Sequence, residues 1–330
     1  MLLKFLIFLL FSVVPLIASP FSLQVSPHFY ADNTEFFDAY RIGETYLGND
    51  LLTIGKYKIS DNLDFGLGFY ANFYYGDENP VSQFLPASVL SYHIGTNFNF
   101  LMGFLDNKNR HNMLDALQSE ELIYYRKMEY GFQLKQNYKY FVSDSWINWN
   151  LLNTAQHREY FDFGNNFLLP YKIFSLNLQT YISHHGGQLY HTGAVRDNLS
   201  MALGLNIDTK WNHFLFNGVG GYVYYLTDKS VLDRSMPNLT TTGQGYLVEG
   251  YVCFYNFKLY CDYWKGNDFI TEEGNALYRT SQPYIFYGLR KEKYIKENTW
   301  FDIELRMHNI ENKFEYQYRF GFTSRLIFRL

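Results

Sequence analysis

The most regular feature of this sequence is an alternation of apolar and polar residues that recurs along the chain. In the segment Phe314–Leu330, aromatic or aliphatic side chains occupy the even positions and polar or charged side chains the odd ones, with only Ser324 and Ile327 out of step. Successive side chains of a strand point to opposite faces. The segment therefore predicts a β-strand with one apolar face and one polar face.

Similar alternation predicts strands over residues 63–74, 174–183, 199–208 and 301–308. In each of these segments the polar face includes glycine or charged residues, which the packed core of a soluble sheet seldom accepts unpaired. A transmembrane barrel instead turns the apolar face to lipid and the polar face to its lumen. The pattern thus favours an all-β fold, a transmembrane antiparallel β-barrel, over a soluble two-layer sheet.

The connections between the predicted strands alternate in length. Short turns are expected near 309–312, 291–294, Asn256 and 208–210, and longer loops at 266–280, 226–243 and 185–197. Outer-membrane barrels join their strands by short periplasmic turns and longer outer loops. We therefore expect about 16 strands, within a range of 12–18, and both termini on the periplasmic side. Residues 20–45 alternate poorly and could form either a strand or an N-terminal arm.

The N-terminus predicts export. Lys4 precedes an apolar run over residues 5–17, and the small residues Ala18 and Ser19 follow, which is the order of a secretory signal peptide. The alternative, an uncleaved membrane anchor, needs an apolar helix of roughly 20 residues, longer than this run. The predicted organisation is a cleaved signal peptide at 1–19 and a single barrel domain at 20–330.

Composition agrees with a barrel. Aromatic residues make up 20% of the 330 residues, yet the mean hydropathy is −0.24, as expected where half of each strand faces lipid and aromatic girdles mark the interfaces. The net charge of −4 is close to balanced, which argues against a nucleic-acid partner. The two cysteines, Cys253 and Cys261, fall on opposite faces of a predicted hairpin, so we expect free thiols.

The alternation, the aromatic closing strand and the predicted signal peptide together resemble the porin-like outer-membrane β-barrels of diderm bacteria, although those barrels usually end on Phe rather than on Leu330. This resemblance implies location in the outer membrane, contact with outer-membrane lipid and insertion by the outer-membrane assembly machinery. It also implies passive or substrate-biased passage of small hydrophilic solutes. We expect no cofactor, and we assign no catalytic or metal-binding residue.

The inward positions of the predicted strands carry charged and aromatic residues that would set the selectivity of a pore. They describe equally well a weakly selective channel and an interior cross-linked by ion pairs. The inward Trp146, with Tyr70, Tyr74, Tyr160 and Tyr181, could form an aromatic track on which sugar rings stack. Tyrosine is so abundant in this chain that chance placement of these rings is the alternative. The predicted lumen-lining residues are Lys56, Lys58, Asp64, Tyr70, Trp146, Asp162, Tyr181, Glu249, Asp302, Glu304, Arg306, Glu315 and Arg319, with Arg325 on the same face.

Three histidines, His184, His185 and His191, cluster near one end of a predicted strand. Histidine serves as a general base or metal ligand, but a polar loop at the pore mouth is the simpler interpretation. Neither His184 nor His191 begins the His-x-Ser-Asn pattern of outer-membrane phospholipases and lipid A deacylases. An outer-membrane enzyme acting on lipid or glycan through these histidines remains an alternative to the channel. A filled barrel that serves as an anchor or adhesin is another.

Residues 112–122 have apolar side chains at helical spacing within one long connection, 106–120. The segment could fold inward and narrow the pore, or it could be a short helix on the surface.

The last hairpin predicts a specific register. A four-residue loop at 309–312 joins its two strands in our alignment, and opposite charges that face each other stabilise an antiparallel pair. This register places two ion pairs inside the barrel, Asp302 with Arg319 and Arg306 with Glu315.

Overall fold

The computed structural model describes residues 20–187, 189–211 and 215–329, so the predicted signal peptide lies outside the described residues. The strands are β1 (Phe21–Glu35), β2 (Thr45–Ser60), β3 (Leu63–Tyr74), β4 (Val81–Ile94), β5 (Phe98–Phe104), β6 (Tyr130–Asn137), β7 (Val142–Leu151), β8 (Tyr160–Tyr171), β9 (Phe174–His185), β10 (Arg196–Lys210), β11 (Phe216–Val231), β12 (Thr240–Phe254), β13 (Phe257–Asn267), β14 (Tyr284–Lys296), β15 (Thr299–Ile310), β16 (Lys313–Ser324) and β17 (Leu326–Arg329). The helices are η2 (Lys108–Asn112), α2 (Leu122–Tyr125) and η3 (Ala276–Arg279). Within the described ranges, no helix is long and apolar enough to cross a membrane.

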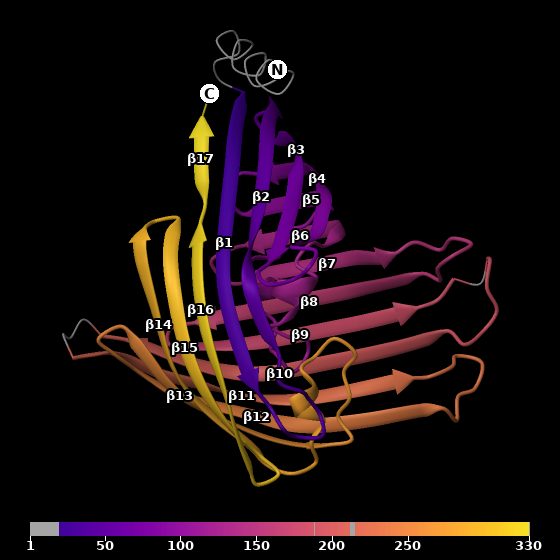
Figure 1. The fold of residues 1–330 in the computed structure, drawn as a ribbon, viewed down its shortest axis with the longest axis vertical. Helices are drawn as coiled ribbons and strands as arrows, with labels where there is room; N and C mark the ends of the chain where they lie inside the picture. Colours follow the sequence, from indigo (N-terminus) through magenta and orange to yellow (C-terminus); the bar gives the residue numbers. More distant parts are fainter. Residues whose placement is uncertain (1–19, 188, 212–214, 330) are drawn as a thin grey trace.

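The sheet closes on itself. Each strand pairs antiparallel with its neighbours in chain order, and β1 pairs with β2 on one side and with both β16 and β17 on the other. β16 and β17 are successive parts of one barrel strand interrupted at Arg325, so the described residues form a closed barrel with 16 strand positions (Figure 1). The predicted all-β fold and strand count are confirmed. Most of the uncertain segment 20–45 is the long strand β1.

The two ends of the barrel differ. The start of β1 and the end of β17 lie together at one end (Figure 1). Two-residue turns such as 61–62, 255–256 and 297–298 also belong to this end, which we call the turn end. The other end, the loop end, carries the connections 36–44, 75–80, 105–129, 152–159, 186–195, 232–239 and 268–283, and one tight turn at 311–312.

The wall alternates as the sequence predicts. On β10, the outward side chain of Leu203 is 51% exposed, whereas that of the inward residue Ala202 is 1% exposed. The next inward position, Gly204, leaves room for the ring of Tyr224, because a Cβ atom there would lie 2.2 Å from that ring. The outward face is therefore apolar and the inward face is packed.

This wall predicts a depth-dependent cost for charge on the outward face. We expect Leu203→Arg, near the middle of β10, to lower the free energy of unfolding in lipid by about 2–4 kcal/mol, because it places a cation near the bilayer centre. Ile207→Arg, nearer the turn end on the same face, should cost only about 0–1 kcal/mol. Urea unfolding in lipid vesicles measures both, and equal costs at the two positions would contradict a membrane-spanning wall.

The predicted register of the last hairpin is wrong by two residues. β15 and β16 join through a tight turn at Glu311 and Asn312, whose φ angles of 50° and 65° are left-handed, as in the two-residue turns that match strand twist. We had expected a four-residue loop. Glu304 consequently faces Arg319, whereas Asp302 faces Gly321. The expected Asp302–Arg319 and Arg306–Glu315 pairs are not formed.

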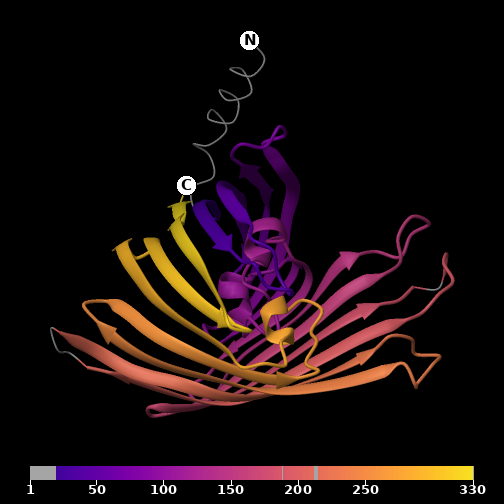
Figure 2. The same ribbon diagram turned by 60° about the horizontal axis from the view of Figure 1, so that its bottom comes forward.

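Two of the loop-end connections fold into the barrel rather than away from it. Residues 105–129 bury Met113, Ala116 and Leu117 against the inner wall, and residues 268–283 bury Phe269 and Leu277 in the same apolar cluster. Figure 2 shows the short helices of these segments within the ring of strands. The inward alternative for 112–122 is therefore correct, although the regular helix in this part of the chain spans only Leu122–Tyr125. These two segments therefore occupy much of the interior of the loop half.

The membrane orientation is testable by labelling. In a background in which Cys253 and Cys261 are serine, we expect Ser235→Cys to react with an impermeant thiol reagent on intact cells, because its loop extends from the loop end. Lys210→Cys, at the opposite end of β10, should stay unlabelled until the cells are opened. Labelling of Lys210→Cys but not of Ser235→Cys on intact cells would contradict the predicted topology. Asn275, in the long loop expected at 266–280, is unsuitable for this test because its amide donates to Asp115 inside the barrel.

Candidate functional site

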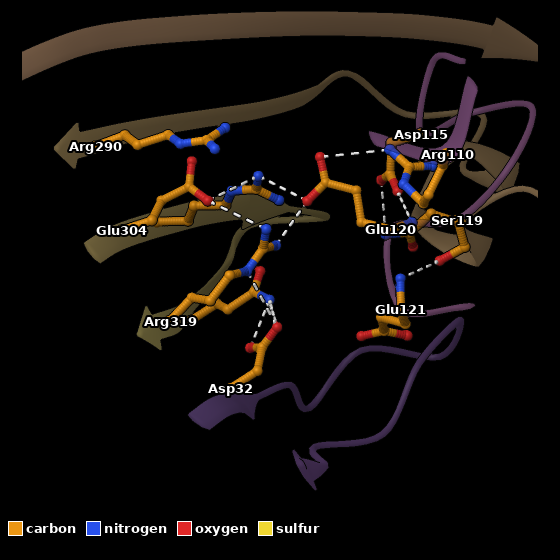
Figure 3. A network of polar contacts seen from close by, with 12 residues as sticks. Asp32, Arg110, Asp115, Ser119, Glu120, Glu121, Arg290, Glu304 and Arg319 are labelled. Carbon is orange, nitrogen blue, oxygen red and sulfur yellow. Dashed lines mark hydrogen bonds and ion pairs between the residues drawn. The ribbon is translucent and has the colours of Figure 1, made fainter. Parts of the chain in front are cut away.

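A network of ion pairs fixes the inward-folded segment 105–129 to the barrel wall (Figure 3). The Glu120 carboxylate accepts hydrogen bonds from Arg319 at 2.6 Å and from Arg306 at 2.9 Å. Both guanidinium groups also contact Glu304, at 3.5 Å from Arg319 and 3.0 Å from Arg306. One carboxylate from a loop thus joins two arginines from neighbouring strands, β15 and β16.

The network extends to the first strand, β1, which pairs with β16 and places Asp32 directly opposite Arg319. Asp32 of β1 accepts hydrogen bonds from Arg319 at 3.3 Å, from Gln317 at 2.8 Å and from the hydroxyl of Tyr124 at 2.9 Å. Each carboxylate that we name in this network has a cationic neighbour, so buried charge is compensated, as the interior of a protein requires.

Electrostatics hold Glu120 in its charged form. Burial by itself would raise the pKa of this loop carboxylate, but the Arg306, Arg319 and Arg110 guanidinium groups hold it well below its usual range. Removing the charge of Glu120 would leave two buried cations underpaired.

The predicted lumen residues fall into separate groups in the structure. Glu304, Arg306 and Arg319 meet in the network described above. The others have local partners or line the cavity described below. Lys58 pairs with Asp61, Asp64 lies near His93, and Glu249 pairs with Lys258. Glu315 accepts a hydrogen bond from the backbone N–H of Phe37, Asp162 contacts Arg126, and Lys56 and Tyr70 line the cavity. Asp302 is half-buried and forms no ion pair within the described residues.

The inward aromatic rings do not form an accessible track. His111 stacks on Trp146 with ring centroids 3.7 Å apart, and Tyr181 packs edge-on to the same indole. Tyr160 is covered by His185 at 4.1 Å. Tyr70 belongs to a different cluster on the other side of the barrel. These rings are core residues in this structure, so the sugar-stacking interpretation finds no support.

A cavity of about 380 Å³ occupies the lumen beside segment 105–129. Its wall includes Asp50, whose carboxylate accepts from Lys127 at 2.7 Å and contacts His28 at 2.8 Å. Residues that belong to the turn end, among them Lys56 and Arg325, complete the lining.

The three predicted pore-mouth histidines separate. His184 occupies an outward position of β9, and its Nδ1 lies 2.7 Å from the Asp197 carboxylate of β10 directly opposite. His185 points inward and contacts Glu272, and His191 contacts the backbone carbonyl of Thr154 at 3.1 Å. They do not converge on a metal site, and no group of three or more potential ligands occurs in the described part of the chain.

The His184–Asp197 pair has the arrangement of an oriented base. Asp197 accepts from Arg234 at 2.7 Å, and the ring of Phe161 packs against the imidazole at 4.8 Å. An imidazole that donates from Nδ1 to a carboxylate has its Nε2 lone pair free to accept a proton. The pair lies on the outer wall at the loop end, separate from the lumen.

Several of these residues could not be selected from sequence. Asp32 lies in the segment with weak alternation, and Glu120 lies in a connection. Asp197 lies thirteen residues after His184, and only the strand pairing brings the two together. The sequence signal that could have indicated this pair is a histidine at the end of one predicted strand and an acid at the start of the next.

Known structures share the fold. A loop-deletion form of OmpT from Vibrio cholerae has a TM-score of 0.59 at 9% identity, covering 93% of this chain and 100% of that one. Salmonella typhi OmpF in complex with daunomycin gives 0.53 at 12%, covering 93% and 97%. A mutant porin of Rh. blastica gives 0.53 at 9%, covering 93% and 100%. The predicted porin-like outer-membrane barrel fold is thus confirmed, and at these identities nothing beyond the fold follows.

Sequence comparison adds a family. No curated protein matches this chain. A family model described as lipid A 3'-O-deacylase-type matches residues 15–330, which include all the strands described above. The chain belongs to the lipid A 3'-O-deacylase-type family.

Proposed function

We propose that this protein is an outer-membrane esterase that hydrolyses the 3'-O-linked acyl ester of lipid A. The observation that carries the proposal is the His184–Asp197 pair, which combines a base and its orienting carboxylate on the outward face of the barrel. The family model supports the reaction. We further propose that the loop end faces the cell exterior and that the barrel reaches the membrane through the outer-membrane assembly machinery.

The proposed mechanism uses water as the nucleophile. His184 donates from Nδ1 to Asp197 and takes a proton from water at Nε2, and the water oxygen attacks the ester carbonyl carbon. The tetrahedral intermediate collapses with cleavage of the bond between the carbonyl carbon and the sugar oxygen. The imidazolium returns its proton to that oxygen, so the products are a fatty acid and a free hydroxyl group.

Neighbouring residues support this assignment. The side chain of Ser183, next to His184, donates to Asp162 inside the barrel at 3.0 Å and therefore cannot act as a nucleophile on the outward face. Arg234, which is 59% exposed on its side chain, binds Asp197 and keeps its charge compensated. Phe161 offers an apolar surface beside the imidazole.

The direct test is mass spectrometry of lipid A incubated with the purified protein in mixed detergent micelles. We expect lipid A to lose one ester-linked acyl chain and an equimolar amount of fatty acid to appear. A boiled sample and an unrelated barrel serve as controls. Intact lipid A after prolonged incubation with folded protein would contradict the proposal.

A second candidate is solute passage, the function of a porin-like channel. It is favoured by the width of a barrel with 16 strand positions and by the cavity in its turn half. Segments 105–129 and 268–283 fill the loop half, so passage requires these segments to move. Conductance of the protein in planar bilayers distinguishes this candidate from the esterase, which needs no open lumen.

A further inference from the structure

The cavity in the turn half of the lumen has a distinct chemical order along strand β2. The inward residues of this strand run Asp50, Leu52, Ile54 and Lys56, and all four line the cavity. The inner carboxylate pairs with Lys127 at 2.7 Å and contacts the His28 imidazole at 2.8 Å. An apolar section follows, and a cation lies toward the turn end.

The charge toward the turn end is positive and unpaired. Lys56 and Arg325 both line the cavity, where the charge of Arg325 repels that of Lys56 and the carboxylates of Asp106 and Asp64 attract it. Across residues 20–187, 189–211 and 215–329, neither forms an ion pair with a carboxylate. The nearby Asp106 is bonded to Lys135 at 2.8 Å. Two like charges beside an apolar wall attract an anion.

The apolar section is continuous around the cavity. Ile54 and Met128 are buried in one cluster with Tyr70, and Leu52 and Phe104 pack against it. The Tyr70 hydroxyl is buried and has no hydrogen-bond partner among the described residues. A buried donor without an acceptor is costly, so this hydroxyl is available to an oxygen atom of a ligand.

We propose that this cavity is a binding site for a small organic carboxylate with an apolar body. The carboxylate lies between Lys56 and Arg325, and the body packs against Ile54, Leu101 and Phe104. A volume of about 380 Å³ falls in the range of small-molecule sites, roughly 300–1,000 Å³. The site is separate from the His184–Asp197 pair and does not depend on the proposed esterase activity.

Titration calorimetry of the full barrel in detergent micelles tests the site with three probes. Phenylacetate has charge and an apolar body, inorganic phosphate has charge alone, and benzyl alcohol has the body alone. We expect saturable binding of phenylacetate at one site and binding at least about tenfold weaker for the other two, corresponding to about 1.4 kcal/mol. Equal affinities for the three probes, or no saturable binding of phenylacetate, would overturn the proposal.

Variants identify the residues. Lys56→Met and Arg325→Met should each weaken phenylacetate binding about tenfold or more. The matched control is Lys58→Met, two residues further along β2, where the side chain pairs with Asp61 outside the cavity. An equal loss in the control would reduce the effect to general surface charge. His184→Ala should bind phenylacetate normally, which separates this site from the esterase.

Discussion

His184→Ala is expected to lower the rate of lipid A deacylation by about 10²–10⁴-fold, because it removes the proposed general base. Asp197→Asn should also reduce the rate, since the amide no longer favours the tautomer that leaves Nε2 free. The barrel should remain folded, because both residues lie at strand ends on the outer wall. Release of fatty acid from lipid A in micelles measures the rate.

The matched control for this prediction is His191→Ala. His191 lies in the adjacent loop and contacts the backbone carbonyl of Thr154. Its loss should therefore leave the rate within about twofold of wild type, in line with the small effects of surface substitutions. A full rate in His184→Ala, or an equal loss in His191→Ala, would reject the assignment of the base. If the wild-type barrel folds normally but does not deacylate lipid A, the second candidate, solute passage through the lumen, becomes the preferred function.

Glu120→Gln should open the lumen. The substitution preserves shape but removes the carboxylate that binds Arg306 and Arg319, leaving two buried cations underpaired. Removing one partner of a buried ion pair costs about 3–5 kcal/mol. We expect a lower free energy of unfolding and discrete conductance in planar bilayers, where the wild-type barrel with its packed segment stays closed.

An exposed ion pair provides the comparison. Lys210 and Asp208 pair at the turn end of β10, where their side chains are 86% and 54% exposed, and Lys210→Gln should change the free energy of unfolding by only about 0–1 kcal/mol with no change in conductance. Conductance equal in wild type and Glu120→Gln would show that the network does not hold the loop segment in place. In that case the Glu120 network would contribute only to the stability of the barrel.

Local periodicity was sufficient to predict the barrel. In β10, β15 and β16 the two-residue alternation is clear enough to assign strands with one apolar and one polar face. Turn positions were less predictable. At Glu311–Asn312 a left-handed two-residue turn replaced the expected longer loop, and because the side-chain pattern repeats every two residues, a shift by two preserves the faces while it exchanges every cross-strand partner.

The candidate sites depended on contacts that no local pattern encodes. Glu120 meets Arg306 and Arg319 only because a long connection turns into the barrel, which helical spacing in 112–122 left open. The His184–Asp197 pair follows from strand pairing across a loop of irregular structure. The histidines were selected from their clustering, but clustering did not indicate that one of them faces outward and another inward.

The position of the Glu120 network has a consequence for how the barrel assembles. Asp32 belongs to the first strand and Arg319 to the strand that closes against it, while Glu120 comes from the middle of the chain. The contacts therefore span the seam between the beginning and the end of the chain. A barrel that has not closed cannot complete them, and a closed barrel without the internal segment lacks one of the three carboxylates that contact Arg319. We therefore expect enclosure of the segment and joining of the chain ends to stabilise each other during assembly.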